Sequence, residues 1–385
     1  MNVSNCSAYE LIEESKISDL NSTGYLLRHK KSGARVAVLE NDDENKVFNI
    51  GFRTPPKDST GVAHIVEHTV LCGSDKFPVK DPFIELAKGS LNTFLNAMTY
   101  PDKTVYPVAS CNDKDFQNLM HVYLDAVFYP NIYKEEKIFR QEGWHYELES
   151  VDGELIYNGV VFNEMKGVFS SPDQQLARII QKSLLEDTPY GFESGGDPKA
   201  IPDLTYEMFL DFHKTYYHPS NSYIYLYGNM DVAEKLAFID EAYLCQFDNT
   251  RVDSAIAKQA PFAHPSVTRG EYPIGNDDRE DNAAYMAYSW VVGDSLDAKL
   301  CLGFQILEYA LMEAPGAPLK QALLDKGFGE DIYGMFETSL IQPYLSIIIK
   351  NINEEDRDEI VQVIQTELKK LADGGLNHKT LEGAL

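Results

Sequence analysis

The chain has 385 residues, of which 44% are hydrophobic and 24% charged, proportions typical of a soluble globular protein with two or three domains. Its formal net charge of −26 argues against a nucleic-acid partner, because binding a phosphate backbone needs clustered Lys and Arg. Acidity on this scale is expected of a solvated surface. It would also attract cationic peptides if the acidic groups lined a cavity.

The cysteines and the N-terminal segment indicate a reducing compartment. Five cysteines, an odd number with no C-x-x-C pair, make a disulfide framework or an all-cysteine zinc site improbable. Residues 1–17 match neither a signal peptide nor a transit peptide, and no apolar run reaches the roughly 18 residues of a membrane span. We therefore expect a bacterial-type cytoplasmic protein that does not enter a membrane.

The first predicted elements are strands joined by polar turns, which lie over residues 24–30, 34–41 and 46–54. A helix is then expected to begin near Ser59 and Thr60, where a hydroxyl can cap it, and to stop at Gly73. The elements predicted after it are helix 82–88, strands 90–99 and 103–110, a helix from Asn112, helices 133–149, 159–169 and 174–185, strand 220–230 and a helix from Val232.

The same order of elements recurs later in the chain, displaced by roughly 240 residues. Residues 247–278 are polar, contain three prolines and have no clear period, so they are expected to form a linker. The elements predicted beyond it are strand 283–292, helices 300–312 and 317–327, strands 329–338 and 344–352, and helix 354–371. This pattern predicts a first module over 1–246 and a second, truncated one over 279–385, and it predicts that the chain is a fragment of a longer polypeptide.

The motif His64-Ile65-Val66-Glu67-His68 lies in the helix expected from residue 60 onward. Residues four apart share one helix face, so both imidazoles can reach one ion. Glu67 then lies beside the metal, where its carboxylate can take a proton from a zinc-bound water. This order of residues is the H-x-x-E-H signature of inverted-motif zinc peptidases.

An accidental match to this motif occurs in about one chain of this length per hundred. The alternative is a purely structural role, in which two hydrogen-bonded histidines lie beside a carboxylate on a helix that binds no metal. The helix is apolar over most of its circumference and is therefore predicted to be buried. Buried polar side chains need partners, and a metal ion would supply one.

Spacing alone does not identify the third ligand. A catalytic zinc usually has three protein ligands and an open fourth position. Four glutamates downstream are candidates for the third ligand, and the spacing favours none of them over the others: Glu142, Glu147, Glu149 and Glu164.

Long segments of the chain resemble the pitrilysin/insulinase family of zinc metallopeptidases, and most closely its presequence-protease (falcilysin-like) subgroup. The resemblance covers residues 10 to 245 and continues more weakly beyond. The segments that carry it are GVAHIVEHTVLCGS, SLNTFLNAMTYPDKTVYPVAS, FRQEGWHYELE, GVVFNEMKGVFSSPD and DTPYGFESGGDPKAIPDLTYEMFLDFHKTYYHPSNSYIYLYGNMD.

The resemblance implies an α+β fold of repeated modules, each a mostly antiparallel sheet packed against helices. It implies one zinc ion per chain, held by His64, His68 and Glu164, with Glu67 as general base. It also implies that an edge strand takes the peptide substrate as an added strand, with Asn96 and Ala97 nearest the metal. The alternative is that this strand lies inside the sheet, with neighbours on both sides, and has only a structural role.

Family members of this kind have four modules in two halves, and the second half contributes an Arg and a Tyr that no segment here matches. The C-terminal half of the same polypeptide is therefore an expected partner. The resemblance predicts a zinc-dependent endopeptidase that cuts unstructured peptides. It also predicts that the present chain, without the C-terminal half, is poorly active. The alternative is a non-catalytic structural or assembly subunit, but such members have lost motif residues.

His145, His213 and His218 are expected to be structural. The SGGD segment at 194–197 lacks the rest of a phosphate loop, and a structural role is expected for it too.

Overall fold

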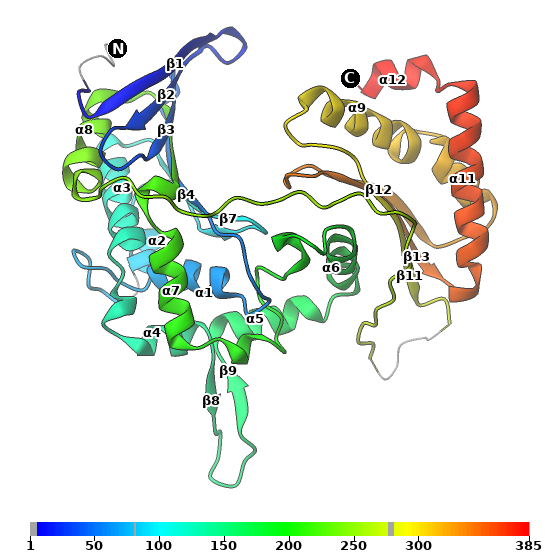
Figure 1. Cartoon of the computed structure of the whole chain (residues 1–385), viewed down its shortest axis with the longest axis horizontal. Helices are drawn as coiled ribbons and strands as arrows, with labels where there is room; N and C mark the ends of the chain where they lie inside the picture. Colours follow the sequence, from blue (N-terminus) through cyan, green and yellow to red (C-terminus); the bar gives the residue numbers. More distant parts are fainter. Residues whose placement is uncertain (1–5, 81, 276–280, 385) are drawn as a thin grey trace. The chain divides into compact units, whose positions relative to one another are not determined.

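The computed structural model describes residues 6–80, 82–275 and 281–384. Contacts within the chain divide it into two compact units, and Figure 1 shows both. The first unit, here unit 1, comprises Met1–Gly167 and Phe192–Ala255, and unit 2 comprises Val168–Gly191 and Ile256–Leu385. Among the described residues, none of the helices combines the length and the apolar character needed to cross a bilayer.

Unit 1 is built on an eight-stranded sheet in the order β1-β2-β3-β10-β4-β7-β5, with β6 also paired to β7. Neighbouring strands are antiparallel except for β3 and β10, so the sheet is mostly antiparallel, as predicted. Its strands are β1 (Tyr9–Ile17), β2 (Ser22–His29), β3 (Arg35–Glu40), β4 (Lys46–Arg53), β5 (Asn92–Leu95), β6 (Met98–Thr99), β7 (Lys103–Ser110) and β10 (Ser222–Gly228). A separate hairpin is formed by β8 (His145–Glu147) and β9 (Ile156–Asn158).

Helices pack on this sheet through apolar side chains. Phe48 and Ile50 of β4 are fully buried, and so are Phe116 and Leu119 of α3, which makes these elements part of the core of unit 1. The α3 helix begins where the Asn112 side chain accepts a hydrogen bond from the third helical N–H, as an N-cap should. The helices of unit 1 are α1 (Val62–Val70), α2 (Pro82–Gly89), α3 (Asp113–Phe128), α4 (Glu136–Glu142), α5 (Val160–Phe169), α7 (Tyr206–Tyr216) and α8 (Val232–Ala242).

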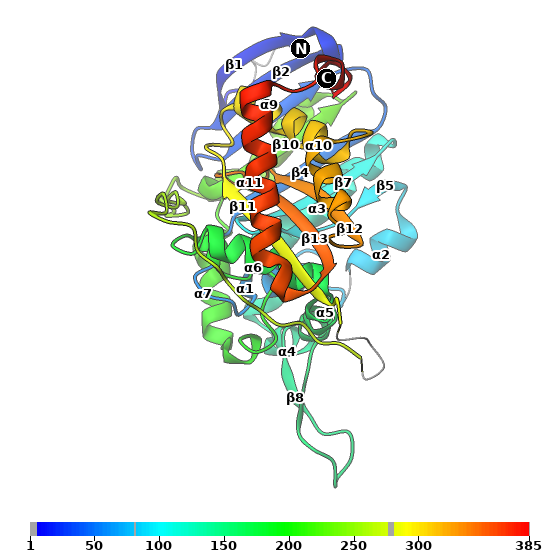
Figure 2. The same cartoon turned by 90° about the vertical axis from the view of Figure 1, so that its right-hand side faces the viewer.

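Unit 2 has a three-stranded antiparallel sheet in the order β11-β13-β12. Its core joins β13 to α11 through four buried isoleucines, Ile347, Ile349, Ile360 and Ile364, and Figure 2 shows α11 running along the sheet. The elements of unit 2 are β11 (Ala284–Val291), β12 (Asp331–Glu337), β13 (Tyr344–Ile352), α6 (Pro172–Leu184), α9 (Ala298–Glu308), a π-helical turn (Tyr309–Glu313), α10 (Pro318–Asp325), α11 (Arg357–Gly374) and α12 (His378–Ala384).

The two units repeat one topology. In unit 1 the strands β4, β7 and β5 are neighbours, with α1 and α2 between β4 and β5 and α3 after β7. In unit 2 the strands β11, β13 and β12 are neighbours in the same order, with α9 and α10 between β11 and β12 and α11 after β13. The predicted α+β class with repeated sheet-and-helix modules is therefore confirmed.

The compact units do not follow the division expected at 246 and 279. Residues 168–191, expected in the first module, belong to unit 2, because α6 packs on its sheet. Ile180 of α6 lies in one buried cluster with Leu340, Tyr344 and Ile348. The described part of the expected linker, 247–275, has no α-helix or strand, and it divides at residue 255 between the two units; residues 276–278 lie outside the described residues.

Two elements of unit 1 differ from their predicted form. The helix expected over 133–149 is α4 alone, which stops before Gly143 and is followed by β8. A side chain at Gly143 would come within 2.9 Å of the Phe139 carbonyl oxygen, so the chain turns there at a residue that has none. The strand expected over 90–99 is broken into β5 and β6, with Asn96 and Ala97 between them.

Candidate metal centre

The α1 helix carries the H-x-x-E-H motif in a buried position. Eight of its nine residues are buried, including His64 and Glu67, as the apolar pattern predicted. The helix begins after Gly61, whose φ of 70° is in the left-handed region that favours glycine. A side chain at Gly61 would lie 2.6 Å from the Gly196 Cα atom, so the start of α1 packs directly on the loop at residues 195–196.

His64 and His68 lie one turn apart with ring centroids separated by 4.9 Å. The Nδ1 atom of His64 is 3.0 Å from the Gly195 carbonyl oxygen, which can only accept a hydrogen bond. The Nδ1 atom of His68 is 3.3 Å from Oε2 of Glu142. Both Nδ1 atoms are therefore assigned as donors, and both Nε2 atoms keep a free lone pair.

Glu164 on α5 faces these two lone pairs. Its Oε2 atom is 3.8 Å from Nε2 of His64 and 3.8 Å from Nε2 of His68. The three residues offer ligand atoms that all lie within 4.8 Å of one another, and the Glu164 side chain is 49% exposed. Two neutral imidazoles and one carboxylate, with one side open, are the donor set of a catalytic zinc site, so these residues fit that ion.

The other three candidate glutamates lie elsewhere. Glu142 is on the opposite ring edge of His68 from Glu164, so the structure makes it a partner of a proposed ligand rather than a third ligand. Glu147 accepts a hydrogen bond from Asn158 across the β8–β9 hairpin. Glu149 is exposed in the turn region of that hairpin. Of the four, only Glu164 comes together with both histidines.

Glu67 is 7% exposed, and its carboxylate contacts β6. Its Oε2 atom accepts a hydrogen bond of 2.7 Å from the Thr99 hydroxyl on β6. A buried carboxylate that accepts a hydrogen bond from a hydroxyl and is next in sequence to His68 has the chemistry of a general base. This places the predicted base beside the three candidate ligands.

Asn96 and Ala97 lie where β5 ends and β6 begins. Both strands pair with β7 alone among the described strands, so the segment is an edge of the sheet and not an inner strand. The Asn96 N–H donates to the Pro107 carbonyl at 3.2 Å, and the Asn96 carbonyl accepts from the Tyr123 hydroxyl at 3.3 Å. The Ala97 N–H donates to the Asn96 side-chain oxygen at 3.0 Å. Their role in binding a substrate stays a prediction.

Charge shapes the pKa values around His68. Burial alone would lower the pKa of His68, but its hydrogen bond to Glu142 and the nearby carboxylates raise it above its ordinary value. Burial would raise the pKa of Glu142, but hydrogen bonds from His68 and Gln141 lower it instead. Glu142 is therefore an ionised acceptor for the His68 N–H.

The three histidines expected to be structural each contact other parts of unit 1 and not the candidate site. His145 Nδ1 lies 2.8 Å from the Arg140 carbonyl oxygen, and His218 Nδ1 accepts from the Ser220 N–H at 3.1 Å. His213 is buried between the Val127 carbonyl and the Tyr133 hydroxyl, at 2.9 and 2.8 Å. Burial lowers the pKa of His213 to about 4.

Three partners of the site escaped the sequence prediction. The SGGD loop, expected to be structural, supplies the Gly195 carbonyl to His64, and a side chain at Gly195 would come within 3.0 Å of Met165 on α5. Glu142 was named only as a possible ligand, and Thr99 was not named at all. The paired glycines were the one local signal, because adjacent glycines indicate a close approach of backbone to another element.

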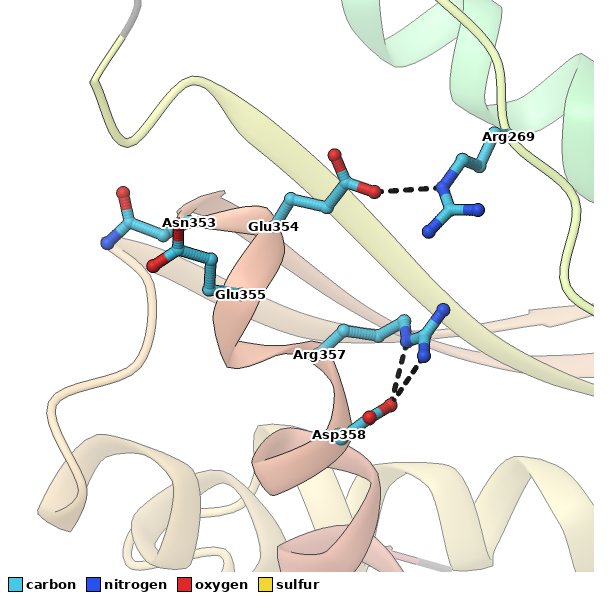
Figure 3. Close-up of a pocket in the computed structure, with 6 residues that line it drawn as sticks. All are labelled: Arg269, Asn353, Glu354, Glu355, Arg357 and Asp358. Carbon is cyan, nitrogen blue, oxygen red and sulfur yellow. Dashed lines mark hydrogen bonds and ion pairs between the residues drawn. The ribbon is translucent and has the colours of Figure 1, made fainter.

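Two hollows lie in the described part of unit 2. One has a volume of about 440 Å³. Figure 3 shows its lining, in which Arg269 pairs with Glu354 and Arg357 pairs with Asp358. These are surface ion pairs with exposed partners, and such pairs contribute little to stability or chemistry. A second hollow of about 510 Å³ is apolar and lies among β11, α9 and β13, with Trp290, Phe304 and Leu345 in its wall.

Known proteins share both the sequence and the fold. The family model described as insulinase (peptidase family M16) matches residues 46–168, and that of the peptidase M16 inactive domain matches residues 203–385. Protein HypA of Clostridium perfringens is 48% identical over 98% of this chain, and presequence protease 1 (chloroplastic/mitochondrial) of Arabidopsis thaliana is 46% identical over 98%. The chain spans 39% and 35% of the lengths of these relatives.

Solved structures agree in fold. The crystal structure of pitrilysin has a TM-score of 0.66 at 17% identity, covering 97% of this chain and 39% of its own. A protease from Helicobacter pylori has a TM-score of 0.66 at 16% identity, covering 94% of this chain and 83% of its own. The repeated sheet-and-helix architecture, the two matching models and the relatives named presequence protease lead to one conclusion: the chain belongs to the pitrilysin/insulinase (M16) family of peptidases.

Proposed function

We propose that this chain forms the zinc-binding and catalytic part of a zinc endopeptidase that hydrolyses unstructured peptides. The observation that carries the proposal is that His64 and His68 of α1 come together with Glu164 of α5, which is 164 − 68 = 96 residues beyond His68, next to the buried Glu67. Two relatives are peptidases by name, which supports the same activity for the longer polypeptide. That polypeptide, with its C-terminal half, is the proposed full enzyme.

Each residue has a distinct role in this proposal. The Nε2 atoms of His64 and His68 and one carboxylate oxygen of Glu164 would hold one zinc ion. When bound, zinc supplies Lewis acidity that brings the pKa of a water ligand to about 7. Glu67 would accept a proton from the attacking water as its oxygen adds to the peptide carbonyl carbon, and would return that proton to the amine that leaves when the C–N bond breaks. Thr99 holds the Glu67 carboxylate toward the site while this happens.

The edge formed by β5 and β6 is the proposed holder of substrate. Main-chain hydrogen bonds to an added strand bind a peptide with little sequence preference, which suits an unstructured substrate. Because Thr99 of β6 bonds Glu67, a peptide on this edge would lie next to the base. Asn96 and Ala97 are the proposed positions nearest the scissile bond, and the Ala97 N–H would exchange its bond to the Asn96 side chain for one to substrate.

Zinc analysis of purified variants tests the metal centre. The unsubstituted chain should retain about one zinc after dialysis, His68→Ala should retain almost none, and Glu67→Gln should retain the ion because Glu67 is not a ligand. Equal zinc content in the chain and in His68→Ala would refute the proposal.

Peptide hydrolysis tests the role of the proposed C-terminal half. The chain alone should bind zinc yet cleave a fluorogenic unstructured peptide at close to the background rate, because no residue here supplies the expected Arg and Tyr. Rapid cleavage by the purified chain, abolished by Glu67→Gln, would show that the C-terminal half is not needed.

A further inference from the structure

Three arginines lie on neighbouring strands at one end of the sheet of unit 1. Arg28 of β2 is the direct cross-strand partner of Arg35 of β3, and Arg53 is the last residue of β4. Each adjoins a buried core residue of its own strand, namely Leu27, Val36 and Phe52. Because successive side chains of a strand point to opposite faces, all three arginines lie on the face of the sheet away from that core.

Tyr223 of β10 brings two of these guanidinium groups together. The Cζ atoms of Arg35 and Arg53 lie 3.7 and 5.6 Å from the centre of its ring. Arg35 also donates hydrogen bonds to the Tyr223 hydroxyl and, at 3.3 Å, to the Ser220 carbonyl oxygen. The residue opposite Tyr223 on β4 is Gly51, which has no side chain, so Arg53 can reach the ring from two residues further along. One aromatic ring therefore supports two cations.

The described acidic residues do not neutralise this arginine cluster. None of the described Asp or Glu side chains forms an ion pair with any of the three arginines. The nearby lysines, Lys31 and Lys103, each form one. Like charges that face each other across two strands are destabilising, so the cluster costs free energy unless an anion joins it. Such a cluster is unusual in a chain whose formal net charge is −26.

The central arginine has a hydrogen-bonding group without a use in the described structure. Nε of Arg35 is buried and has no hydrogen-bond partner there. Burial lowers the pKa of Arg35 below its ordinary value, the charges of Arg53 and Arg28 lower it further, and Tyr223 offsets part of this. An oxyanion at the cluster would both accept from free N–H groups and reduce the repulsion among the three charges.

We propose that the cluster of Arg28, Arg35 and Arg53 binds a carboxylate of the peptide substrate, an inference that rests on the proposed function. The planar guanidinium fork matches a carboxylate and binds it through two parallel hydrogen bonds. An unstructured peptide carries this group at its C-terminus and on acidic side chains. Both sources present the same pair of oxygens.

The cluster lies at the same end of the sheet as the proposed substrate edge. Arg53 pairs with Lys103 of β7. The next residue of β7, Thr104, pairs with Thr99 of β6, whose hydroxyl bonds Glu67. Strands are about 4.8 Å apart, so a peptide added beside β6 would run about 14 Å from β4. Four or five extended residues span about that distance, which lets one peptide contact both places.

Titration with acetate tests the site directly. In ¹⁵N NMR of the purified, metal-free chain at constant ionic strength, the Arg35 Nε–H signal should shift with acetate and reach a plateau. Arg53→Gln should weaken acetate roughly 10-fold, because a charge-assisted hydrogen bond is lost. Arg53→Lys keeps the charge but not the fork, and should recover only part of the affinity. The matched control is Arg269→Gln, an exposed arginine of unit 2, which should leave acetate binding unchanged.

Three labelled peptides of one unstructured sequence separate the two sources of the carboxylate. The first has a free C-terminus and no acidic side chain, the second has a C-terminal amide instead, and the third is that amide with one internal glutamate. In fluorescence anisotropy with the metal-free chain, the second should bind roughly 10-fold more weakly than the first or the third. The difference should disappear in Arg53→Gln and in Arg28→Gln, and circular dichroism confirms that both variants are folded.

The outcomes separate this inference from the proposed function. An Arg35 signal that does not respond to acetate would overturn the site. A saturable response with equal affinity for all three peptides would overturn the assignment of the carboxylate to substrate. Neither measurement uses metal or catalysis, so a chain that retains no zinc yet shows the expected peptide difference would overturn the metal centre and leave the carboxylate site in place.

Discussion

The α1 helix of unit 1 and the α9 helix of unit 2 occupy the same place in one repeated topology, yet their surroundings differ. Eight of the nine residues of α1 are buried, whereas none of the eleven residues of α9 is. At a displacement of 241 residues, Gln305, Glu308 and Tyr309 of unit 2 stand where unit 1 has His64, Glu67 and His68.

The candidate site of unit 1 depends on more than the α1 motif. The partners of α1 that complete the site, Glu142, Glu164 and the Gly195 carbonyl, all follow α3 in the sequence. These segments also cover α1, because α4 and α7 pack on it. The module therefore depends on its later half for the burial of α1 and for Glu164, while α1 in the first half carries both histidines and Glu67.

The largest expected difference between the modules is in metal binding. His64→Ala should weaken zinc binding on the order of 1,000-fold, because one of the three proposed protein ligands is lost. The aligned change Gln305→Ala should have no effect on zinc content or affinity. Chelator competition on both variants measures this, and a comparable loss in Gln305→Ala would break the assignment of the ion to unit 1.

Core packing should differ next. Ile65 is fully buried in α1, so Ile65→Ala should lower the free energy of unfolding of unit 1 by about 3–4 kcal/mol. The aligned Ile306 in α9 is only half-buried, and Ile306→Ala should cost about 1 kcal/mol in unit 2. Hydrogen exchange of the amides in each helix, measured at increasing denaturant concentration, gives both changes in the free energy of unfolding. Equal losses of stability in the two units would contradict the contrast in burial.

Acid should weaken unit 1 through His213. Its pKa of about 4 in the folded chain lies below the ordinary value near 6.5, so folding favours the neutral ring. The resulting stability is present above pH 6.5 and is lost as the pH falls toward 4, by up to about 3 kcal/mol.

The variant His213→Gln can keep both hydrogen bonds and should unfold with a shallower acid dependence between pH 6.5 and 4. The control is His264→Gln in unit 2, where the side chain is exposed and the acid dependence should not change. Melting temperatures measured across this pH range decide the matter, and identical slopes for His213→Gln and the unsubstituted chain would exclude His213 as the cause.

Helix caps should not distinguish the modules. Asp231 caps α8 in unit 1 and Asp297 caps α9 in unit 2, each accepting from a backbone N–H at 3.1 and 2.9 Å. Alanine at either position should cost about 1 kcal/mol, because an exposed cap depends on local geometry and not on core packing. Thermal melts of both variants test this, and a loss several times larger at one cap would mean that tertiary contacts contribute there.

Local patterns in the sequence were enough to predict most strands, the buried α1 helix and its paired histidines. They failed where tertiary contacts override propensity, as at Gly143, where close packing ends α4 and the charge-rich stretch turns into a hairpin. Glu164 could not be chosen over Glu142 from spacing, because both lie on helices far along the chain. Only the folding of α4 and α5 against α1 places one at Nδ1 and the other near Nε2 of His68.

The separation of the histidines and Glu164 along the chain has a consequence for the local stability of α5. An ion held by α1 and α5 would cross-link segments 96 residues apart, which closes a long loop and reduces the conformational freedom of the unfolded chain. Only Val161, Phe162 and Met165 of α5 are buried, so this helix has few other anchors. A chelator should therefore loosen α5 before it disturbs the sheet.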